Sequence, residues 1–157
     1  MAVKNNVTRM LDARGIAYEA CELPNEKIGA LEAAEYLGAL PEEVFKTIVA
    51  ITPDGSGKVL AMVAGSDEVD AKALGHTLST KKVKITSQKE AERITGLRAG
   101  GISPLALLNK GFQVVLDDAA SALAQIYISG GQWGLNIRIS PQDLIALSGA
   151  QVAKITR

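Results

Sequence analysis

Lys46 is the residue whose surroundings first suggest chemistry. The segment 44–51 is apolar and rich in β-branched residues on both alternating faces, which predicts a buried strand interrupted by this lysine. A period of two places Lys46 on the same face as Val44, Ile48 and Ala50. A lysine on an edge strand guards against aggregation, whereas a lysine inside a sheet must find a partner or reach a cleft. Residues 52–57 predict a turn and 58–64 a second strand, so a further neighbour on the other side would make Lys46 part of a site.

Two glycine-containing loops could supply backbone groups to such a site. The first is 99–104, which ends in the rigid Ser103-Pro104, and the second is Ser129-Gly130-Gly131. Consecutive glycines let the backbone approach a ligand closely, and their N–H groups can hold a carbonyl or an oxyanion. The alternatives are an ordinary turn after Gly96 and an ordinary hairpin turn, and the residues alone favour neither interpretation.

Other reactive side chains are few and scattered. His76 is the only histidine and is expected in a solvated loop, and Cys21 is expected to be a small core residue of a strand. A Cys21–His76 dyad would require two distant segments to meet. One histidine and one cysteine cannot supply a metal cluster, and no dinucleotide or P-loop fingerprint is present, so no metal or cofactor is predicted.

Composition predicts one domain over residues 1–157. Hydrophobic residues make up 47% of the chain but aromatic residues only 4%, which indicates an aliphatic core. The net charge of zero argues against binding nucleic acid by charge alone, so local shape or a partner must contribute. No apolar run reaches membrane-spanning length and the N-terminus lacks a signal-peptide core, which predicts a cytoplasmic protein without a membrane partner.

The predicted elements indicate an α+β fold. Helices are expected at 4–14, 29–38, 70–74 (closed by Gly75-His76), 88–95 and 141–147. Strands are expected at 16–22, 44–51, 58–64, 81–85, 112–116, 124–128, 135–139 and 151–155. Because strands come in groups without regular βα alternation, we expect a mixed, strongly curved or barrel-like sheet surrounded by helices.

Three segments taken together resemble a known family. Residues 44–47, 100–105 and 128–131 closely resemble the YbaK/EbsC family, which is similar to the editing domain of bacterial prolyl-tRNA synthetases. The resemblance covers nearly the whole chain, and the joint spacing of the segments carries its specificity. It implies a trans-editing hydrolase of translation fidelity that deacylates mischarged aminoacyl-tRNA, with Cys-tRNA(Pro) as the substrate of the best-known branch.

The resemblance also implies functional residues. Lys46 matches the family's functional lysine near the tRNA 3′ end, and Gly101 matches the glycine whose backbone lines the aminoacyl pocket; both are implied as catalytic. The implied substrate-binding residues are Phe45, Thr47, Gly100, Ile102, Ser103, Pro104, Ser129, Gly130, Gly131, Asn136 and Leu23. The cysteine-specific branch has tyrosine, aspartate and glycine where this chain has Leu23, Asn136 and Ala106, so a changed substrate preference or a weaker activity stays open.

The absence of a strong general base fits a reaction in which the substrate brings its own nucleophile. In the family, the resemblance implies attack by the cysteinyl thiol on its own ester, or by a positioned water for other amino acids. The implied partners are the 3′ end of aminoacyl-tRNA and a prolyl-tRNA synthetase. The alternatives are a non-catalytic tRNA- or synthetase-binding module, a deacylase for alanine or serine, and a small-molecule hydrolase.

Overall fold

The computed structural model describes residues 3–157 as five α-helices, three short 3₁₀ helices and eight strands. The α-helices are α1 (Asn6–Ala13), α2 (Ala30–Leu37), α3 (Ala71–Thr77), α4 (Gln88–Thr95) and α5 (Pro141–Ser148). The 3₁₀ helices are η1 (Pro41–Glu43), η2 (Pro104–Ala106) and η3 (Asp118–Ala122). The strands are β1 (Tyr18–Glu22), β2 (Phe45–Ile51), β3 (Lys58–Ala64), β4 (Lys84–Ile85), β5 (Phe112–Asp117), β6 (Ile126–Ser129), β7 (Leu135–Ile139) and β8 (Gln151–Ala153).

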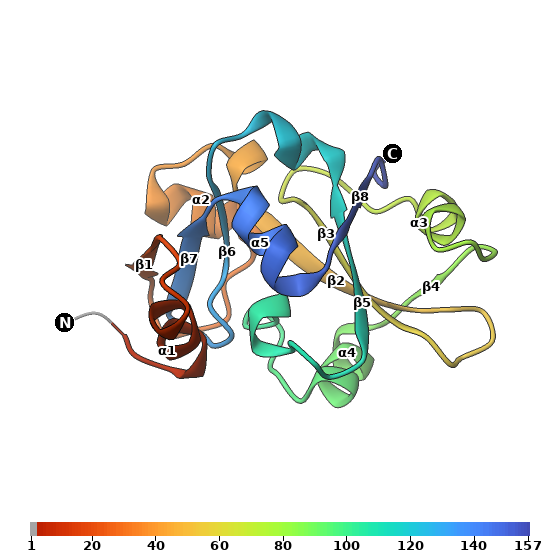
Figure 1. Ribbon diagram of the computed structural model, residues 1–157, viewed down its shortest axis with the longest axis horizontal. Coiled ribbons are helices and arrows are strands. Elements are labelled where there is room, and N and C mark those ends of the chain that lie inside the picture. Colours follow the sequence, from red (N-terminus) through yellow and green to blue (C-terminus); the bar gives the residue numbers. More distant parts are fainter. Residues whose placement is uncertain (1–2) are drawn as a thin grey trace.

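The strands form two sheets that are joined by a single bridge. An antiparallel sheet has the order β1-β7-β6, and a mixed sheet has the order β4-β2-β3-β5-β8 with parallel β3–β5 and β5–β8 pairs. A single parallel bridge between Val44 and Tyr127 joins β6 to the start of β2. Figure 1 shows the first sheet to one side of the molecule, with β2, β3 and β5 crossing the middle. The predicted α+β class with a mixed sheet and outer helices is confirmed.

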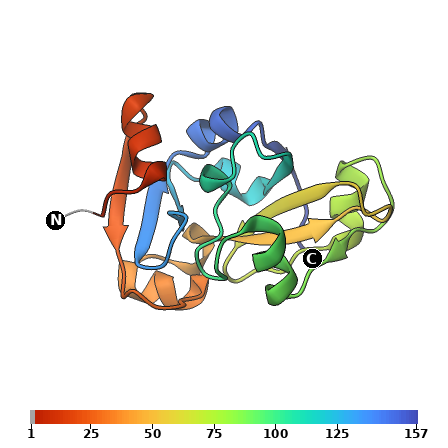
Figure 2. The same cartoon turned by 90° about the horizontal axis from the view of Figure 1, so that it is seen from below.

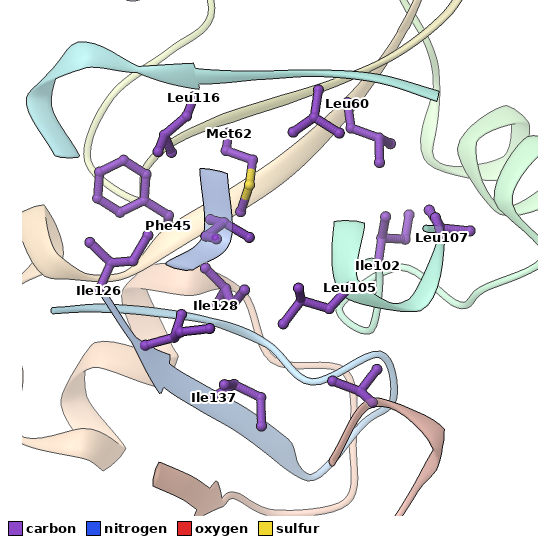
Figure 3. Close-up of a cluster of buried hydrophobic side chains, with 14 of the residues drawn as sticks. Phe45, Leu60, Met62, Ile102, Leu105, Leu107, Leu116, Ile126, Ile128 and Ile137 are labelled. Carbon is purple, nitrogen blue, oxygen red and sulfur yellow. The ribbon is translucent and has the colours of Figure 1, made fainter. Parts of the chain in front are cut away.

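The two sheets share one aliphatic core. Figure 3 shows side chains from both sheets directed toward one another: Phe45, Leu60, Met62, Leu116, Ile126, Ile128 and Ile137. The segment 102–107, which contains η2, inserts Ile102, Leu105 and Leu107 into the same cluster. Burying one such side chain contributes roughly 1.5–3 kcal/mol, so the loop that carries Gly100 and Gly101 is held firmly at its Ile102 end.

Local capping signals fixed several helix ends as predicted. The Ser87 side chain accepts a hydrogen bond from the Glu90 N–H at 3.1 Å, and α4 ends at Gly96 in the left-handed conformation. Ser140 caps α5 in the same way, with Pro141 at its first position and left-handed Gly149 at its end. These ends were predictable because capping requires only neighbours in the sequence.

Several predicted boundaries are wrong. The helix expected at 4–14 is Asn6–Ala13, and the strands expected at 16–22, 124–128 and 151–155 are Tyr18–Glu22, Ile126–Ser129 and Gln151–Ala153. Helix α3 does not close at Gly75-His76 but continues to Thr77, and Gly75 is buried within it. A Cβ on Gly75 would collide with the carbonyl oxygen of Lys81, so this glycine serves close packing rather than helix termination. The strand predicted over 81–85 is reduced to Lys84–Ile85, the short β4.

Within residues 3–157, no helix combines the length and the apolar character needed to cross a bilayer.

Candidate functional site

A cavity of about 260 Å³ opens where β2 lacks a strand neighbour on its outer edge. On that edge, β6 contributes only the bridge at Val44, and β4 pairs only with Ala50 and Ile51. The stretch between these two contacts is left without a strand partner. The cavity occupies this gap, and both faces of the strand contribute to it, because residues 44–49 all line it. A break in sheet pairing therefore creates the site.

The register directs backbone polar groups of Thr47 into the gap. Val44 accepts a hydrogen bond from the Gly65 N–H at 2.7 Å, so the even-numbered residues of β2 turn their N–H and C=O groups toward β3. The odd-numbered residues face the outer edge, as the Val49 carbonyl shows by accepting from the Thr86 N–H at 3.0 Å. Thr47, halfway between the bridged ends, thus offers one donor and one acceptor to a ligand.

Lys46 lies in the same cavity wall. It is half-buried, and its Nζ donates to the Gly65 carbonyl at 3.2 Å. On its face of β2, Val44 packs into one apolar cluster and Ile48 against another, so the stem of Lys46 lies between two apolar surfaces. The predicted face is confirmed, and the ammonium group is held by the Gly65 carbonyl in a partly buried position. It is the only charged side chain among the lining residues of this cavity.

The glycine loop contributes Gly100 and Ile102 to the wall but uses the Gly101 amide elsewhere. Gly100 lines the cavity with φ +90°, a conformation that favours glycine. The Gly101 N–H donates to the Arg98 carbonyl at 2.8 Å, and a Cβ at Gly101 would lie 3.1 Å from the Cα of Gln132. The Gly101 amide is therefore not free to bind an ester carbonyl, and this expectation is wrong for the conformation observed. Gly101 instead allows the loop to pack closely on the β6–β7 turn.

The second glycine pair forms the β6–β7 turn rather than a wall of the cavity. The Gly130 N–H donates to the Leu135 carbonyl at 2.9 Å. Gly131 has φ +92°, and a Cβ there would lie 3.0 Å from the Cβ of Ala106. The hairpin-turn alternative is the correct one, and only Ser129 of this segment reaches the cavity.

Ser103 and Pro104 are also structural in this conformation. Both are buried, and the Ser103 hydroxyl accepts a hydrogen bond from the Leu105 N–H at 3.2 Å, which caps η2. Neither belongs to the cavity lining, and their predicted contact with substrate stays a prediction. They fix the chain that presents Ile102.

Leu23 and Asn136 meet at a second, much smaller cavity of about 10 Å³. Asn136 and Gly100 line both this space and the main cavity, so they form part of the partition between the two. Leu23 lines only the smaller space and packs with Ile28. Of the predicted substrate-binding residues, the main cavity thus gathers Phe45, Thr47, Gly100, Ile102, Ser129 and Asn136 together with Lys46.

Part of the cavity was not predicted from the sequence. The start of α2 and the segment entering α4 form two walls with the residues Ile28, Gly29, Ala30, Ala33, Thr86, Ser87, Gln88 and Ala91. Lys27 and Gln88 connect these walls by a hydrogen bond of 2.5 Å between exposed side chains. In Figure 2, both α2 and α4 lie in the lower half of the view. The one feature of the sequence that could have indicated these walls is the group of small residues at the start of α2. Small residues at that place equally indicate close packing of the helix.

The two reactive side chains outside the cavity do not form a site. Strand β1, which carries Cys21, and helix α3, which carries His76, lie at opposite ends of the molecule (Figures 1 and 2). Cys21 is half-buried rather than part of a core cluster, which corrects the prediction. Burial, followed by the nearby Glu19 carboxylate, raises the pKa of the Cys21 thiol to about 11, so the group stays protonated and unreactive.

The chemistry available in the cavity is electrostatic. No histidine, cysteine, aspartate or glutamate is among its described lining residues. One ammonium group, four hydroxyls, two carboxamides and a free strand edge line a small space together with apolar side chains. Such an arrangement can bind a compact polar group and stabilise negative charge, but it provides no strong base for abstracting a proton.

Comparison with known proteins identifies relatives over the whole site. The model of the family described as "Aminoacyl-tRNA editing domain" matches residues 26–147. A relative from Enterococcus faecalis (strain ATCC 700802 / V583), named "Putative Cys-tRNA(Pro)/Cys-tRNA(Cys) deacylase EbsC", is 32% identical over 155 residues, covering 98% of this chain and 93% of that protein. A "Proline--tRNA ligase" from Lactobacillus gasseri is 27% identical over 99 residues, which span 63% of this chain and 17% of the ligase.

Solved structures agree with these relatives. A crystal structure described as "a putative trans-editing enzyme for prolyl tRNA synthetase" matches with a TM-score of 0.81 and 26% identity, covering 99% of both chains. The crystal structure of "hypothetical protein APE2540" matches with a TM-score of 0.88 at 24% identity, covering 98% of this chain and 100% of that one. The second likeness shows a shared fold.

Proposed function

The chain belongs to the aminoacyl-tRNA editing domain family, and from this membership we propose that it hydrolyses mischarged aminoacyl-tRNA in trans, with Cys-tRNA(Pro) as its main substrate. The family predicted from the three sequence segments is confirmed. We further propose that residues 1–157 act as one editing domain in the cytoplasm.

The cavity at the open edge of β2 is the observation that carries this proposal. Its volume of about 260 Å³ lies just below the roughly 300–1,000 Å³ of sites for drug-sized ligands, so it suits a small aminoacyl ester. The free N–H and C=O of Thr47 complement an ester carbonyl and an α-amino group. A site of this size would exclude large side chains and admit small ones. It would therefore remove the small amino acids that a synthetase cannot reject by binding alone.

Hydrolysis in this site depends on stabilising charge rather than on a protein base. In the proposed reaction the cysteinyl thiol, or a water molecule for other amino acids, attacks the ester carbonyl. The Lys46 ammonium stabilises the negative charge that develops there or on the adjacent 3′-terminal phosphate. The 3′-oxygen then leaves with the proton released by the nucleophile, so no protein side chain has to change its protonation state. When the thiol is the nucleophile, the product is a cyclic thioester of cysteine, which water then hydrolyses to free cysteine.

A half-buried tryptophan and an exposed arginine beside the cavity suit the tRNA end. The Arg98 guanidinium lies 3.6 Å from the centre of the Trp133 ring, and Trp133 donates to the Ala99 carbonyl at 2.8 Å. The Trp133 Nε1 is also a neighbour of Gly100 in the cavity wall. Arg98 is exposed and has no carboxylate partner among residues 3–157, so its charge is available to a phosphate of the single-stranded tRNA end.

The identity of the amino acid that is removed from the tRNA is the more specific part of the proposal. Cysteine is proposed because the relative from Enterococcus faecalis carries a name for cysteinyl-tRNA deacylation. Alanine and serine are alternatives of similar size, and Leu23 and Asn136 are the positions at which this chain departs from the cysteine-specific pattern. A prolyl-tRNA synthetase is the proposed source of the mischarged tRNA.

The test is deacylation of proline tRNA charged with cysteine, alanine or serine, with correctly charged Pro-tRNA(Pro) as the control. We expect hydrolysis of the cysteinyl ester above the uncatalysed rate and no hydrolysis of the prolyl ester. Hydrolysis of the alanyl or seryl ester alone would identify a different substrate but would still support deacylase activity. Binding of these tRNAs without turnover of any of them would contradict the proposal and indicate a binding module.

A further inference from the structure

The net charge of zero conceals an uneven distribution of charge around the main cavity. Residues 29–43, which include the cavity wall at the start of α2, contain four glutamates and no lysine or arginine. Residues 71–89, which include the wall at the entry to α4, contain five lysines and no aspartate or glutamate. The cavity therefore lies between an acidic and a basic segment of the chain.

The lysines of the basic segment are available to bind an anion. All five are exposed, and none pairs with a carboxylate among residues 3–157: Lys72, Lys81, Lys82, Lys84 and Lys89. The carboxylates that follow on α4 do not cancel this charge, because residues 71–95 hold six lysine or arginine side chains against two glutamates. One of these glutamates, Glu90, already pairs with Arg93 at 3.7 Å. An unpaired positive surface therefore remains.

Packing holds part of this surface at the edge of the five-stranded sheet. Strand β4 is the edge strand, and Val83 directly before it is only 3% exposed, packed in the core cluster that also contains Leu74 of α3. Because Val83 turns inward, its neighbours Lys82 and Lys84 turn outward. The Val83 N–H also donates to the Ala71 carbonyl at 3.2 Å, which fixes the segment against α3. The two lysines therefore project from a packed part of the fold.

Two of the lysines flank the cavity wall itself. The wall at the entry to α4 includes residues 85–88, and Lys84 and Lys89 are the residues directly before and after this stretch. The cavity volume of about 260 Å³ accommodates an aminoacyl end but not the body of a tRNA. The rest of the tRNA must therefore lie on the surface outside, and the wall between Lys84 and Lys89 offers it a positively charged route.

A positively charged edge of this kind suits the phosphates of an RNA duplex. We propose that the acceptor stem of the tRNA docks on the edge formed by β4 and the start of α4, with Lys82, Lys84 and Lys89 contacting its phosphates; this rests on the deacylase function proposed above. Double-stranded RNA is bound mainly through its shape and backbone, so these contacts position the stem and do not read its sequence. The glutamates of residues 29–43 repel phosphates, so the stem leaves the cavity over β4 and not over α2.

The proposed surface explains how a chain without net charge can hold a polyanion. Each phosphate that a lysine neutralises releases counterions, and this gain depends on the local contact rather than on the charge of the whole chain. The alternative is an ordinary solvated surface, because lysines are mostly exposed in folded proteins. The two interpretations differ in the salt dependence of tRNA binding.

The deciding variant combines Lys82→Gln, Lys84→Gln and Lys89→Gln. At about 0.1 M salt we expect it to bind uncharged tRNA(Pro) roughly 100-fold more weakly in fluorescence anisotropy, because each lost phosphate contact removes up to about tenfold in affinity at this salt concentration. The slope of log affinity against log salt concentration should become shallower by about two to three. A minihelix that contains only the acceptor stem should show the same loss.

Kinetics and a matched control separate docking from catalysis. In single-turnover deacylation of Cys-tRNA(Pro), the enzyme concentration that gives half the maximal rate should rise in parallel with the dissociation constant, while the maximal rate stays unchanged. The matched control combines Lys4→Gln, Arg9→Gln and Arg14→Gln, which lie at exposed positions on and beside α1. Helix α1 and strand β4 lie on opposite sides of the molecule (Figure 1), so this equal loss of charge should leave the affinity and the salt slope at wild-type values.

The possible results are distinct. Wild-type deacylation together with wild-type tRNA affinity and salt slope in the lysine variant would overturn the docking surface but leave the proposed function standing. Equal losses in the control on α1 would also overturn it and indicate a general effect of charge. A minihelix bound alike by wild type and variant, or a fall in the maximal rate instead of the affinity, would overturn it as well. Absence of wild-type turnover on the cysteinyl, alanyl and seryl esters would instead remove the proposed function and this inference with it.

Discussion

Replacing Lys46 with methionine should separate catalysis from stability. Methionine keeps the apolar stem between Val44 and Ile48 and removes only the ammonium group and its 3.2 Å bond to the Gly65 carbonyl. The deacylation rate should fall while the melting temperature stays the same or rises, because a half-buried charge with a single protein acceptor contributes little to stability.

The size of the loss follows from Coulomb's law. An ammonium about 4 Å from a developing negative charge stabilises it by about 4 kcal/mol at an effective dielectric constant near 20. Because Lys46 is half-buried, solvent screening reduces this value, and about 1.4 kcal/mol corresponds to a tenfold change in rate. We therefore expect the rate to fall roughly 10²-fold, which corresponds to about 2.7 kcal/mol and lies at the lower end of the range typical of electrostatic stabilisation in active sites.

The assay is single-turnover hydrolysis of labelled Cys-tRNA(Pro), run beside thermal unfolding of the same samples. Lys58→Met is the matched control, because Lys58 also lies on a strand and donates its ammonium to a backbone carbonyl, that of Lys110, at 3.2 Å, but it does not line the cavity. The control should keep the wild-type rate. Activity of Lys46→Met within about threefold of wild type would refute an electrostatic role for this lysine, since the Coulomb energy involved would then be below about 1 kcal/mol.

Three further predictions test other parts of the structure. Arg98→Gln should raise KM about tenfold with little change in kcat, since one charge-assisted hydrogen bond contributes roughly 1.5 kcal/mol. The same variant should lower the slope of tRNA affinity against salt concentration by about one ion, and an unchanged slope would show that Arg98 does not contact the tRNA. Gly75→Ala should lower the free energy of unfolding, measured by urea denaturation, by about 1–3 kcal/mol, because the alanine Cβ would collide with the Lys81 carbonyl. Alanine favours helices more than glycine does, so a stabilised variant would contradict the packing described. Because the pKa of Cys21 is raised to about 11, its alkylation by iodoacetamide at pH 8 should be roughly 100-fold slower in the folded than in the unfolded protein. The alkylation of the folded protein should accelerate as the pH rises toward about 11. Equal rates in the folded and unfolded protein would show that folding does not protect the thiol.

The sequence by itself determined the local elements and the family. Caps such as Ser87 and Ser140 and the left-handed glycines at 96 and 149 act through near neighbours, so the ends of α4 and α5 could be predicted. The alternation along β2 placed Lys46 on the correct face, since side-chain direction in a strand depends on position alone.

Only the tertiary structure decided which groups are free to act. The Gly101 amide is used by the loop itself, and the glycines at 130 and 131 make a turn, because hydrogen-bond partners and packing contacts come from residues distant in sequence. The open edge at Thr47 arises from where β4 and β6 stop pairing with β2. The burial of Asn136 arises from its place on β7 between Cys21 of β1 and Ser129 of β6. Local propensity fixes where strands run, but the gaps between them, where a ligand can bind, depend on the assembly of the whole chain.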